Sequence, residues 1–504
     1  MFTTATAVRV TQPTLLTGSC LAVPAGATVY TNAEVEPHIA VDRTNPNHLV
    51  ATWQQDRLSD GGARALASAV SVDGGATWSD PLAWPVSQCA GGPFARVSDP
   101  WVAVHDLTAF QIGIAFTGGA TTVGARSAVV VTRSIDGGVS WGLPVLLVDD
   151  DGNRTFNDKE TLTVDSTDPR FVYAVWDRID LDERGPTLLA RSIDGGASWL
   201  PSRQVYDPGA GRQTIGNVAI TTPDGVVHVF FTELGPNPGN SAVIEAHLAV
   251  IRSTDKGVTW SPPTQIAELR TVGTRVPDPP QSPVRAGEIL ASFVADPTNG
   301  NLYAAWQDSR FSGGARDAIA LAWSSDGGHT WSAPIRVNAD ASAPAFTPTV
   351  AVTPAGVVGV TYYDFRQVGT STFRPTDVWL AASRDLTAWS EARLAGDFDL
   401  LDAPNANGLF VGDYHGLVVD GSAFLALYAL VNTGATSNRT DVYFDRLDAG
   451  ALAATVAPLA GGARKATEAP AWSAQATERV SRHLSAVREM RHAQWRAWRE
   501  AAPD

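Results

Sequence analysis

Short runs of alternating apolar and polar residues, separated by turn-forming residues, follow one another along most of this chain. In the stretch from Glu36 to Trp78, "PHIAVD" and "HLVATWQ" predict two strands joined by the turn "RTNPN", and "RALASAV" predicts a third. A fourth strand, "LAWPVS", follows shortly after. Together these strands predict one antiparallel meander of about 60 residues.

The same succession recurs from Asp99, Glu160, Gln213, Glu288 and Thr347. Between the third and fourth strands of five units lies a string of the form S-x-D-x-G-x-x-W: "SVDGGATW", "SIDGGVSW", "SIDGGASW", "STDKGVTW" and "SSDGGHTW". A degenerate copy, "SRDLTAW", follows in a sixth unit, and the tryptophans lie 58 to 71 residues apart. Units of this size are typical of propeller blades, so we predict an all-β fold, a β-propeller of four-stranded antiparallel blades.

The number of blades depends on the last unit, which has no such string. There "YHGLVVDGSAFLALYALVN" predicts two strands and "TDVYFDRLD" a third. The early segment Thr6–Gln12 could supply the fourth strand and close the ring, which would leave no open sheet edge. This arrangement gives seven blades; six is the alternative if the last strands pair differently.

Composition is consistent with a turn-rich β protein: the 504 residues include 45 Gly, 32 Pro and 16 Trp. A net charge of −15 argues against a nucleic-acid partner, which would require a basic surface. No apolar run approaches the roughly 20 residues needed to span a membrane. The N-terminus does not resemble a signal peptide, so we expect a cytoplasmic protein, or a secreted one if the true start lies upstream.

The only two cysteines are Cys20 and Cys89. We expect two reduced, buried thiols. The alternative is a single bridge that ties the N-terminal segment to the first repeat, and it would require an oxidising compartment.

The chain changes character after the predicted propeller, which we place at residues 1–450. Residues 451–472 are rich in Ala, Gly and Pro and predict a linker. Residues 473–504 predict a helical tail with an apolar side formed by Val480, Leu484, Val487, Trp495 and Trp498. This helix could pack on the propeller rim or contact a partner.

The repeated string serves the fold rather than the chemistry. Its Ser and Asp bond turn amides, its Gly supplies positive φ, and its Trp packs between sheets. If these turns mark one face of the propeller, the opposite face carries the starts of the first strands and the ends of the second strands. The candidate site residues at the starts are Glu36, Asp99, Asp158, Glu160, Arg285, Glu288, Asp413 and Tyr414.

Second strands in four of the seven units end in an aromatic residue, an aspartate and an arginine, as in "WQQDR" and "WDR". Their arginines are Arg57, Arg178, Arg310 and Arg366. One interpretation is architectural, with Asp–Arg pairs that lock neighbouring blades. The other is a funnel in which arginines bind the carboxylate of an acidic sugar and aromatic faces pack on its ring. Because a structural lock repeats and a catalytic group need not, the strand starts are the better catalytic candidates.

Metal and cofactor sites are not predicted. Residues 149–153, "DDDGN", resemble half of a calcium loop but lack the later glutamate, so a solvated acidic turn is the simpler interpretation. The histidines and cysteines do not have zinc-site spacing, and the glycines belong to the repeated turns.

The repeated string resembles the Asp box, or BNR repeat, of the sialidase superfamily, and its copies cover roughly residues 30–450. The resemblance implies a sialidase-like β-propeller with the Asp boxes on the face opposite the site. The set "EVEPHIAVD", "WQQDR", "SDPW", "NDKE", "YYDFR" and "GDYHG" is also similar to a group of bacterial sialidase-like proteins.

Sialidases use three arginines for the substrate carboxylate, an Asp acid/base, and a Tyr nucleophile primed by Glu. Carried over, Tyr414 is the nucleophile, Glu36 is its base, and Asp99 or Asp158 is the acid. Arg285, Arg310 and Arg366 would form the carboxylate clamp. The chain departs from the family at the R-I-P signature of the first blade, which reads "VEPHIAV" with Glu36 in place of an arginine.

Our first hypothesis is a glycoside hydrolase of exo-α-sialidase type that acts on a terminal acidic sugar. It predicts arginines that converge in one pocket and a tyrosine hydroxyl within reach of a carboxylate. The first alternative is a non-catalytic carbohydrate- or protein-binding propeller. The second is a glycan lyase or another hydrolase on the same scaffold, which would need a Tyr–His pair, such as Tyr414 and His415, or paired carboxylates.

Overall fold

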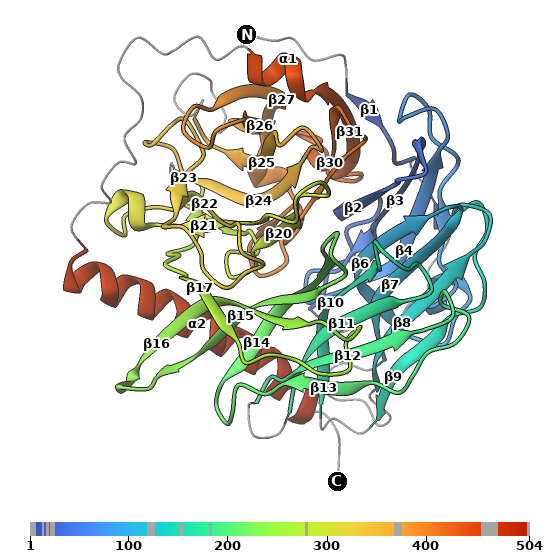
Figure 1. Ribbon diagram of the computed structural model, residues 1–504, viewed down its shortest axis with the longest axis horizontal. Coiled ribbons are helices and arrows are strands. Elements are labelled where there is room, and N and C mark those ends of the chain that lie inside the picture. Colours follow the sequence, from blue (N-terminus) through green and yellow to red (C-terminus); the bar gives the residue numbers. More distant parts are fainter. Residues whose placement is uncertain are drawn as a thin grey trace.

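The alternating stretches form four-stranded antiparallel meanders arranged as blades around a common axis (Figure 1). The computed structural model describes residues 7–12, 15–16, 20, 26–117, 126–151, 155–180, 184–277, 281–366, 375–454 and 472–500. Each blade packs between two neighbours, so its strands bury both faces. In the third strand of blade 1, Ala63–Ser71, every residue is buried.

Blades 1 to 3 follow the chain in order, each with its first strand innermost. Blade 1 contains β2 (Glu34–Asp42), β3 (Asn45–Arg57), β4 (Ala63–Ser71) and β5 (Leu82–Ala83), followed by the 3-10 turn η1 (Gln88–Ala90). Blade 2 contains β6 (Arg96–His105), β7 (Thr108–Thr117), β8 (Arg126–Ser134) and β9 (Val145–Asp151). Blade 3 contains β10 (Phe156–Val164), β11 (Val172–Ile179), β12 (Thr187–Ser192) and β13 (Arg203–Tyr206).

Blades 4 to 6 repeat this order. Blade 4 contains β14 (Gln213–Thr221), β15 (Val227–Asn237), β16 (Asn240–Ser253) and β17 (Thr264–Glu268). Blade 5 contains β20 (Ser292–Ala295), β21 (Leu302–Asp308), the turn η2 (Arg310–Ser312), β22 (Ala318–Ser324) and β23 (Ile335–Arg336). Blade 6 contains β24 (Ala345–Val352), β25 (Val358–Asp364), β26 (Pro375–Ser383) and β27 (Ser390–Asp399), followed by η3 (Leu400–Asp402).

Blade 7 closes the ring with strands from both ends of the chain. Its inner strands are β29 (Gly416–Val419), β30 (Ala423–Val431) and β31 (Thr440–Asp448), and its outer strand is β1 (Val8–Arg9). Val8 pairs with Phe444 and Arg9 with Tyr443 in antiparallel register. The prediction that Thr6–Gln12 would supply this strand is confirmed over the described part, and seven blades are formed.

A small extra sheet connects distant loops beside the axis. It consists of β18 (Thr274–Arg275), β19 (Pro283–Arg285) and β28 (Leu409–Phe410). β19 pairs in parallel with β28, with Arg285 opposite Phe410. This pairing brings the segment before blade 5 against the segment before blade 7.

The hydrophobic core lies mainly between blades. One cluster joins Phe110 and Ile112 of blade 2 to Leu162 and Trp176 of blade 3, and others join blades 5 and 6 or blades 7 and 1. Fully buried tryptophans stand in the second strands of three blades: Trp53, Trp176 and Trp306. The inner strands contact one another in cyclic order around the axis.

The Asp-box turns hold hairpins and pack against the preceding blade. In blade 1, Ser71 Oγ accepts from the amide of Gly75, and the Asp73 carboxylate accepts from the amide and hydroxyl of Thr77. In blade 3, Gly196 has φ 77°, and a Cβ there would lie 2.1 Å from Phe110 of blade 2. In the blades that carry them, the boxes join the third strand to the fourth, at the end opposite the first-strand starts, and have a structural role.

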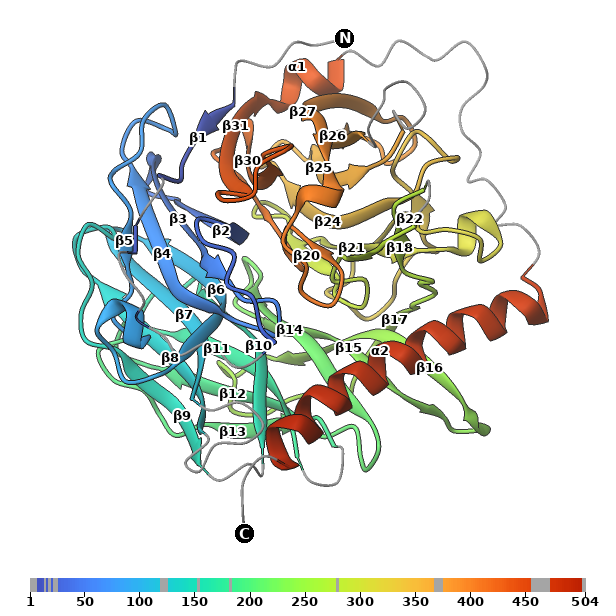
Figure 2. The ribbon, with the colours of Figure 1, turned by 180° about the vertical axis from the view of Figure 1, so that it is seen from behind.

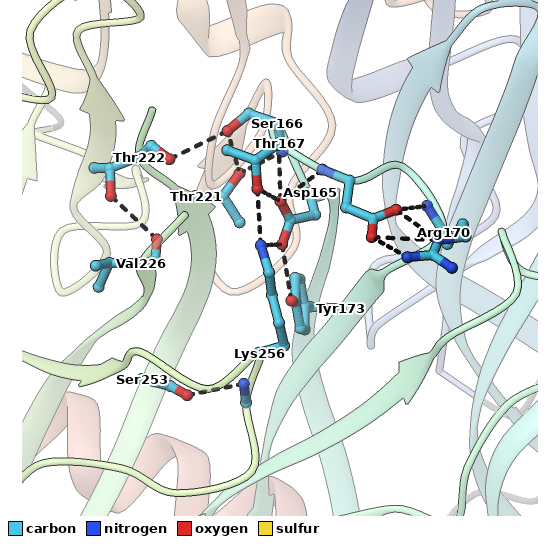
Figure 3. A network of polar contacts seen from close by, with 12 residues as sticks. Asp165, Ser166, Thr167, Arg170, Tyr173, Thr221, Thr222, Val226, Ser253 and Lys256 are labelled. Atoms are coloured by element: carbon cyan, nitrogen blue, oxygen red, sulfur yellow. Dashed lines mark hydrogen bonds and ion pairs between the residues drawn. The ribbon is translucent and has the colours of Figure 1, made fainter. Parts of the chain in front are cut away.

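The box of blade 4 carries a lysine in place of one glycine, and this lysine locks a blade seam (Figure 3). Lys256 Nζ donates to Asp165 Oδ2 at 2.9 Å and to Thr167 Oγ1 at 2.8 Å, both in blade 3. Tyr173 also donates to Asp165 Oδ2 at 2.9 Å. Burial raises the pKa of Asp165, but these bonds outweigh burial and leave it below its usual value.

The expectation of two reduced thiols is wrong, because Cys20 and Cys89 form a disulfide with Cα atoms 4.9 Å apart. Cys89 belongs to the turn η1, so the bridge holds Cys20 against the end of blade 1. The bridge is therefore the alternative that ties the N-terminal segment to the first repeat.

Two helices follow the last strand. α1 (Ala449–Ala454) occupies the first residues of the expected linker, whose remaining residues 455–471 lie outside the described part of the chain. α2 (Ala474–Glu500) crosses one face of the propeller along blade 4 (Figure 2). Val480, Leu484 and Val487 are buried, as predicted, whereas the side chains of Trp495 and Trp498 lie outside the described residues. Among the described helices, none is long and apolar enough to cross a membrane.

Candidate active site

A β-bulge near the start of the inner strand recurs in most blades and shapes the centre of the ring. In blades 1, 2 and 3 the register shifts between Val35 and His38, Ser98 and Trp101, and Asp158 and Thr161. The bulged residues Glu36, Asp99 and Lys159 have φ of 53°, 57° and 50°, a left-handed conformation that costs a non-glycine residue about 1–3 kcal/mol. Three consecutive blades thus use this strained position to carry a charged side chain.

Lys159 is the centre of a buried group of charges that we call the channel cluster: Glu36, Asp99, Lys159, Arg285 and Asp413. Lys159 Nζ lies 2.8 Å from Asp413, 2.9 Å from Asp99 and 3.7 Å from Glu36. Arg285 binds Asp413 with two nitrogens, at 2.6 and 3.1 Å. The cluster therefore joins blades 1, 2, 3 and 7 with the extra sheet.

The predicted Arg57 lies beside this cluster, because Arg57 and Arg285 both pack against the ring of Phe410. The guanidinium carbons of Arg57 and Arg285 each lie 4.7 Å from the centre of that ring. Arg57 is 1% exposed, and burial together with Arg285 lowers its pKa to about 10. Arg285 keeps one fifth of its side chain exposed, so it is the more accessible of the two.

The carboxyl groups of the channel cluster have opposite pKa shifts. Burial raises the pKa of Glu36 to about 8, although Lys159 opposes the shift. For Asp413, Arg285 and Lys159 outweigh burial and hold the pKa well below its usual value. For Asp99, Lys159 and the hydrogen bond from Ser98 outweigh burial and lower the pKa. At neutral pH the site holds a protonated carboxyl group beside two ionised ones, a division typical of acid–base chemistry.

Tyr414 forms the partly exposed wall next to these charges. Its hydroxyl donates to the carbonyl of Pro100 at 2.9 Å, not to a carboxylate as predicted. Trp101 packs edge-on to the Tyr414 ring at 5.7 Å and stacks on His38. Burial and the surrounding carboxyl groups, including Glu160, raise the pKa of Tyr414 well above its usual value.

Glu160 is buried and lacks a hydrogen-bond partner in any other described residue. Burial and the charge of Asp99 raise its pKa well above its usual value. Glu160 is therefore a buried carboxyl group near Tyr414 that is not held by hydrogen bonds to other described side chains.

Helix α2 contributes an arginine to the same face. Arg491 lies 2.9 Å from Asp158 and 2.9 Å from Asp177, and it also donates to Gln213 at 2.9 Å. The Asp158 side chain is 18% exposed, and burial raises its pKa even though Arg491 opposes the shift. Of the predicted acids, Asp158 is the one that combines access to solvent with a raised pKa.

The remaining predicted residues lie outside the channel cluster. Arg178 pairs with Asp150, Arg310 with Asp308, and Arg366 with both Asp364 and Glu391. Glu288 faces His483 of α2 at 3.3 Å. Arg310 and Arg366 thus have partners of their own, and a clamp of Arg285, Arg310 and Arg366 is not assembled.

His415 does not join Tyr414 in one site. Its Nε2 lies 2.6 Å from Thr361 Oγ1 of blade 6, and its ring packs edge-on to Tyr363. Burial lowers the pKa of His415 to about 3, so it stays neutral. The Tyr–His arrangement that a lyase would need is therefore absent at these two residues.

Sequence reasoning missed Lys159 and Arg491. Lys159 stands at the same bulge position as Glu36 and Asp99, so aligning the repeats would have indicated it. Arg491 had no comparable signal, because helix α2 is not part of any repeat. No group of three or more His, Cys, Asp or Glu side chains that could hold a metal occurs among the described residues.

No protein-family model matches the chain, and no curated protein does. Among solved structures, the chain is similar to a Penicillium chrysogenum α-L-arabinanase complexed with arabinobiose (14% identity, TM-score 0.46, covering 89% of this chain and 99% of that one). It is also similar to the Hadza microbial sialidase Hz136 (15%, 0.41, 84% and 67%) and to a Dyadobacter fermentans protein of unknown function (16%, 0.44, 85% and 100%). At these identities and TM-scores the similarities indicate nothing about substrate or catalytic residues, and the propeller is established by the blades of this chain itself.

Proposed function

We propose that this chain is a glycoside hydrolase that cleaves a terminal acidic sugar at the axis of the propeller. The observation that carries the proposal is the partly exposed Tyr414 beside carboxyl groups whose pKa values are driven apart. Glu36 is protonated at neutral pH, while Asp99 and Asp413 are ionised. Such a division supplies both an acid and a base within one site.

Tyr414 is the proposed nucleophile and Asp158 the acid that protonates the leaving oxygen. Asp158 suits this role because its side chain is accessible and its pKa is raised. Asp99 is the proposed base for the Tyr414 hydroxyl, in place of Glu36, because Asp99 is ionised and Glu36 is not. The hydroxyl already contacts the carbonyl of Pro100, the residue that follows Asp99.

An anionic substrate is favoured by the charge balance of the site. Lys159, Arg57 and Arg285 bring three cations to the site; the carboxyl groups facing them are the ionised Asp99 and Asp413 and also Asp158, which a fourth cation, Arg491, contacts. Arg285 is accessible and its planar fork suits a carboxylate. We therefore assign Arg285 to the substrate carboxylate.

The proposal is tested by the release of 4-methylumbelliferone from an acidic panel, the α-sialoside and the β-glucuronide, and from a neutral panel, the α-L-arabinofuranoside and the β-galactoside. We expect hydrolysis of an acidic member that falls at least about 100-fold in Tyr414→Phe and Asp158→Asn. Arg170→Gln, an exposed arginine on the Asp-box face, serves as the control and keeps full activity. Cleavage of neutral substrates alone would refute the acidic-sugar assignment, and cleavage of none would refute the hydrolase.

A non-catalytic glycan-binding propeller is the second candidate, and one observation favours it. Lys159 and Arg285 are already paired with Asp99 and Asp413, as in a structural lock between blades. A glycan-binding propeller would bind the acidic members of the same panel without cleaving them, and calorimetry would detect this binding.

A further inference from the structure

A second concave site lies on the face crossed by helix α2. It is a pocket of about 470 Å³ that shares no lining residue with the channel cluster. α2 forms one wall through Arg479, Arg482 and His483, and the loops around Arg275 and Arg316 form the other. We call it the basic pocket, after these five residues.

The basic pocket gathers positive charge on a chain whose net charge is −15. Four arginines and a histidine line it, and its lining contains neither Asp nor Glu. On an acidic protein, arginines at a surface ordinarily meet carboxylates nearby. Their convergence in one hollow is a feature that the propeller fold itself does not require.

Three of these arginines lack a carboxylate partner among the described residues. Arg479 donates to the carbonyls of Gly313 and Gly314, at 3.0 and 2.8 Å, and Arg316 donates to the carbonyl of Ala341. Arg275 donates to the carbonyl of Gln281 at 3.1 Å. These bonds hold each guanidinium in place and leave more than half of its N–H donors unused.

The other two cations of the basic pocket, Arg482 and His483, pair with glutamates that do not line the pocket. Arg482 pairs with the exposed Glu478 on α2 at 2.6 Å, and His483 lies 3.3 Å from Glu288. The positive charge that remains in the pocket is therefore that of Arg275, Arg316 and Arg479.

We propose that the basic pocket binds a small anion, the carboxylate, sulfate or phosphate group of a ligand about the size of a sugar acid. Guanidinium groups that are held in place and still have free N–H donors match the paired oxygens of such groups. The volume lies within the range of small-molecule sites. This site is separate from the channel cluster and does not depend on catalysis there.

Occupancy of the pocket also ties helix α2 to the propeller. Arg479 belongs to α2, whereas Arg275 ends strand β18 of the extra sheet and Arg316 lies in the loop before β22. A ligand that contacts both walls binds the docked helix and not the released one, so it stabilises docking. We therefore expect ligand binding to slow amide exchange along α2.

The experiment is calorimetric titration of the full chain with glucuronate, with glucose as the neutral counterpart, and with inorganic sulfate, all at constant ionic strength. We expect glucuronate or sulfate to bind and glucose not to bind. The double variant Arg275→Gln/Arg316→Gln should lose at least about tenfold in affinity. Arg170→Gln on the opposite face is the matched charge control and should bind as the unmodified chain does.

Two further measurements assign the binding to this pocket. Arg285→Gln, which alters the channel cluster, should leave the affinity of the basic pocket unchanged, so failure of the proposed hydrolase and failure of this site are distinguishable. If the double variant does not fold, Arg479→Gln replaces it. Binding by sulfate alone would identify a site for inorganic anions; equal binding of glucose, or full affinity in the pocket variants, would overturn the proposal.

Discussion

Lys159 is the residue on which the charges at the propeller axis depend. Its ammonium group contacts Asp99 and Asp413 directly and lies 3.7 Å from Glu36. Burial lowers the pKa of Lys159, but these carboxylates outweigh it and raise the pKa well above its usual value. Without this cation, at least two ionised carboxylates would remain buried with Arg285 as their nearest counter-charge.

We predict that Lys159→Met lowers the free energy of unfolding by about 3–5 kcal/mol, because it removes the charge and keeps most of the side-chain volume. Urea unfolding followed by tryptophan fluorescence measures the change. Arg170→Gln, which breaks an exposed ion pair with Asp168, should have no measurable effect. Unchanged stability of Lys159→Met would mean that the cluster relaxes by taking up protons.

The raised pKa of Glu36 predicts a specific dependence of stability on pH. Burial raises this pKa from 4.5 to about 8, so between these values the folded chain holds a proton that the unfolded chain has lost. Stability contributed by this proton is complete below pH 4.5 and is lost as the pH rises through 8.

Glu36→Gln, which mimics the protonated form, should flatten the fall in stability between pH 5 and 8 by at most about 1.4 kcal/mol per pH unit. Asp317, Asp364 and Asp445 also have raised pKa values and contribute to the same fall in both proteins. Parallel urea titrations across this range measure the difference. Identical slopes in the two proteins would show that Glu36 is ionised in the folded state.

At the scale of single elements, the repeated turns and the strands around them were predictable because their signals are local. The spacing of Gly and Trp in the Asp boxes, and the alternation in β3 and β4, depend on neighbours within one blade. The disulfide was not predictable in this way, because Cys20 and Cys89 are separated by 69 residues and their pairing depends on tertiary structure.

The bridge between Cys20 and Cys89 predicts that the oxidised chain has no thiol that reacts with iodoacetamide under denaturing conditions. Mass spectrometry before and after reduction measures this directly. The double variant Cys20→Ser/Cys89→Ser should lose about 2–4 kcal/mol of unfolding free energy, since the bridge closes a separation of 69 residues. Two reactive thiols in protein purified without reductant would contradict the pairing.

At the scale of the whole molecule, helix α2 is held to the propeller by both apolar and charged contacts. Leu484 is fully buried in the cluster shared with blades 4 and 5, and Ser481 Oγ accepts from the amide of Ile244. Arg491 adds the bonds to Asp158 and Asp177. The periodicity of the sequence predicted the apolar side of this helix. It did not predict the surface that the helix covers, because that surface forms only when the blades have assembled into the ring.

Leu484→Ala should loosen the helix without unfolding the propeller. Removing this buried side chain costs about 2–5 kcal/mol, which raises the population of the undocked helix. We expect trypsin to cleave within residues 472–500 at least about tenfold faster, as measured by mass spectrometry, while strand content by circular dichroism stays the same. Gln475→Ala, an exposed position on the same helix, is the control; equal cleavage of both variants would argue that Leu484 does not anchor the helix.

The blades of the ring were predictable from the sequence because each blade corresponds to one repeat. The candidate site was predictable only in part. Glu36, Asp99, Asp413, Arg285 and Tyr414 were found because strand starts gather at one face of any propeller. Arg310 and Arg366 were candidates because they lie at the ends of second strands, as Arg57 does, but each of these two pairs with a nearby acid instead. Arg285 joins the cluster because the extra sheet positions it there. That sheet pairs segments that are distant in sequence, so the position of Arg285 could not be predicted from the repeats.

The closure of blade 7 by β1 has a consequence for how the chain is made. Val8 leaves the ribosome long before its partner Phe444, and at ordinary rates of synthesis the interval is roughly 20 to 90 s. During that time β1 has been made but its partners β29, β30 and β31 have not, so six blades emerge before the first strand can pair. Blade 7, and with it the ring, is therefore completed only when strands made late in synthesis pair with the first strand of the chain.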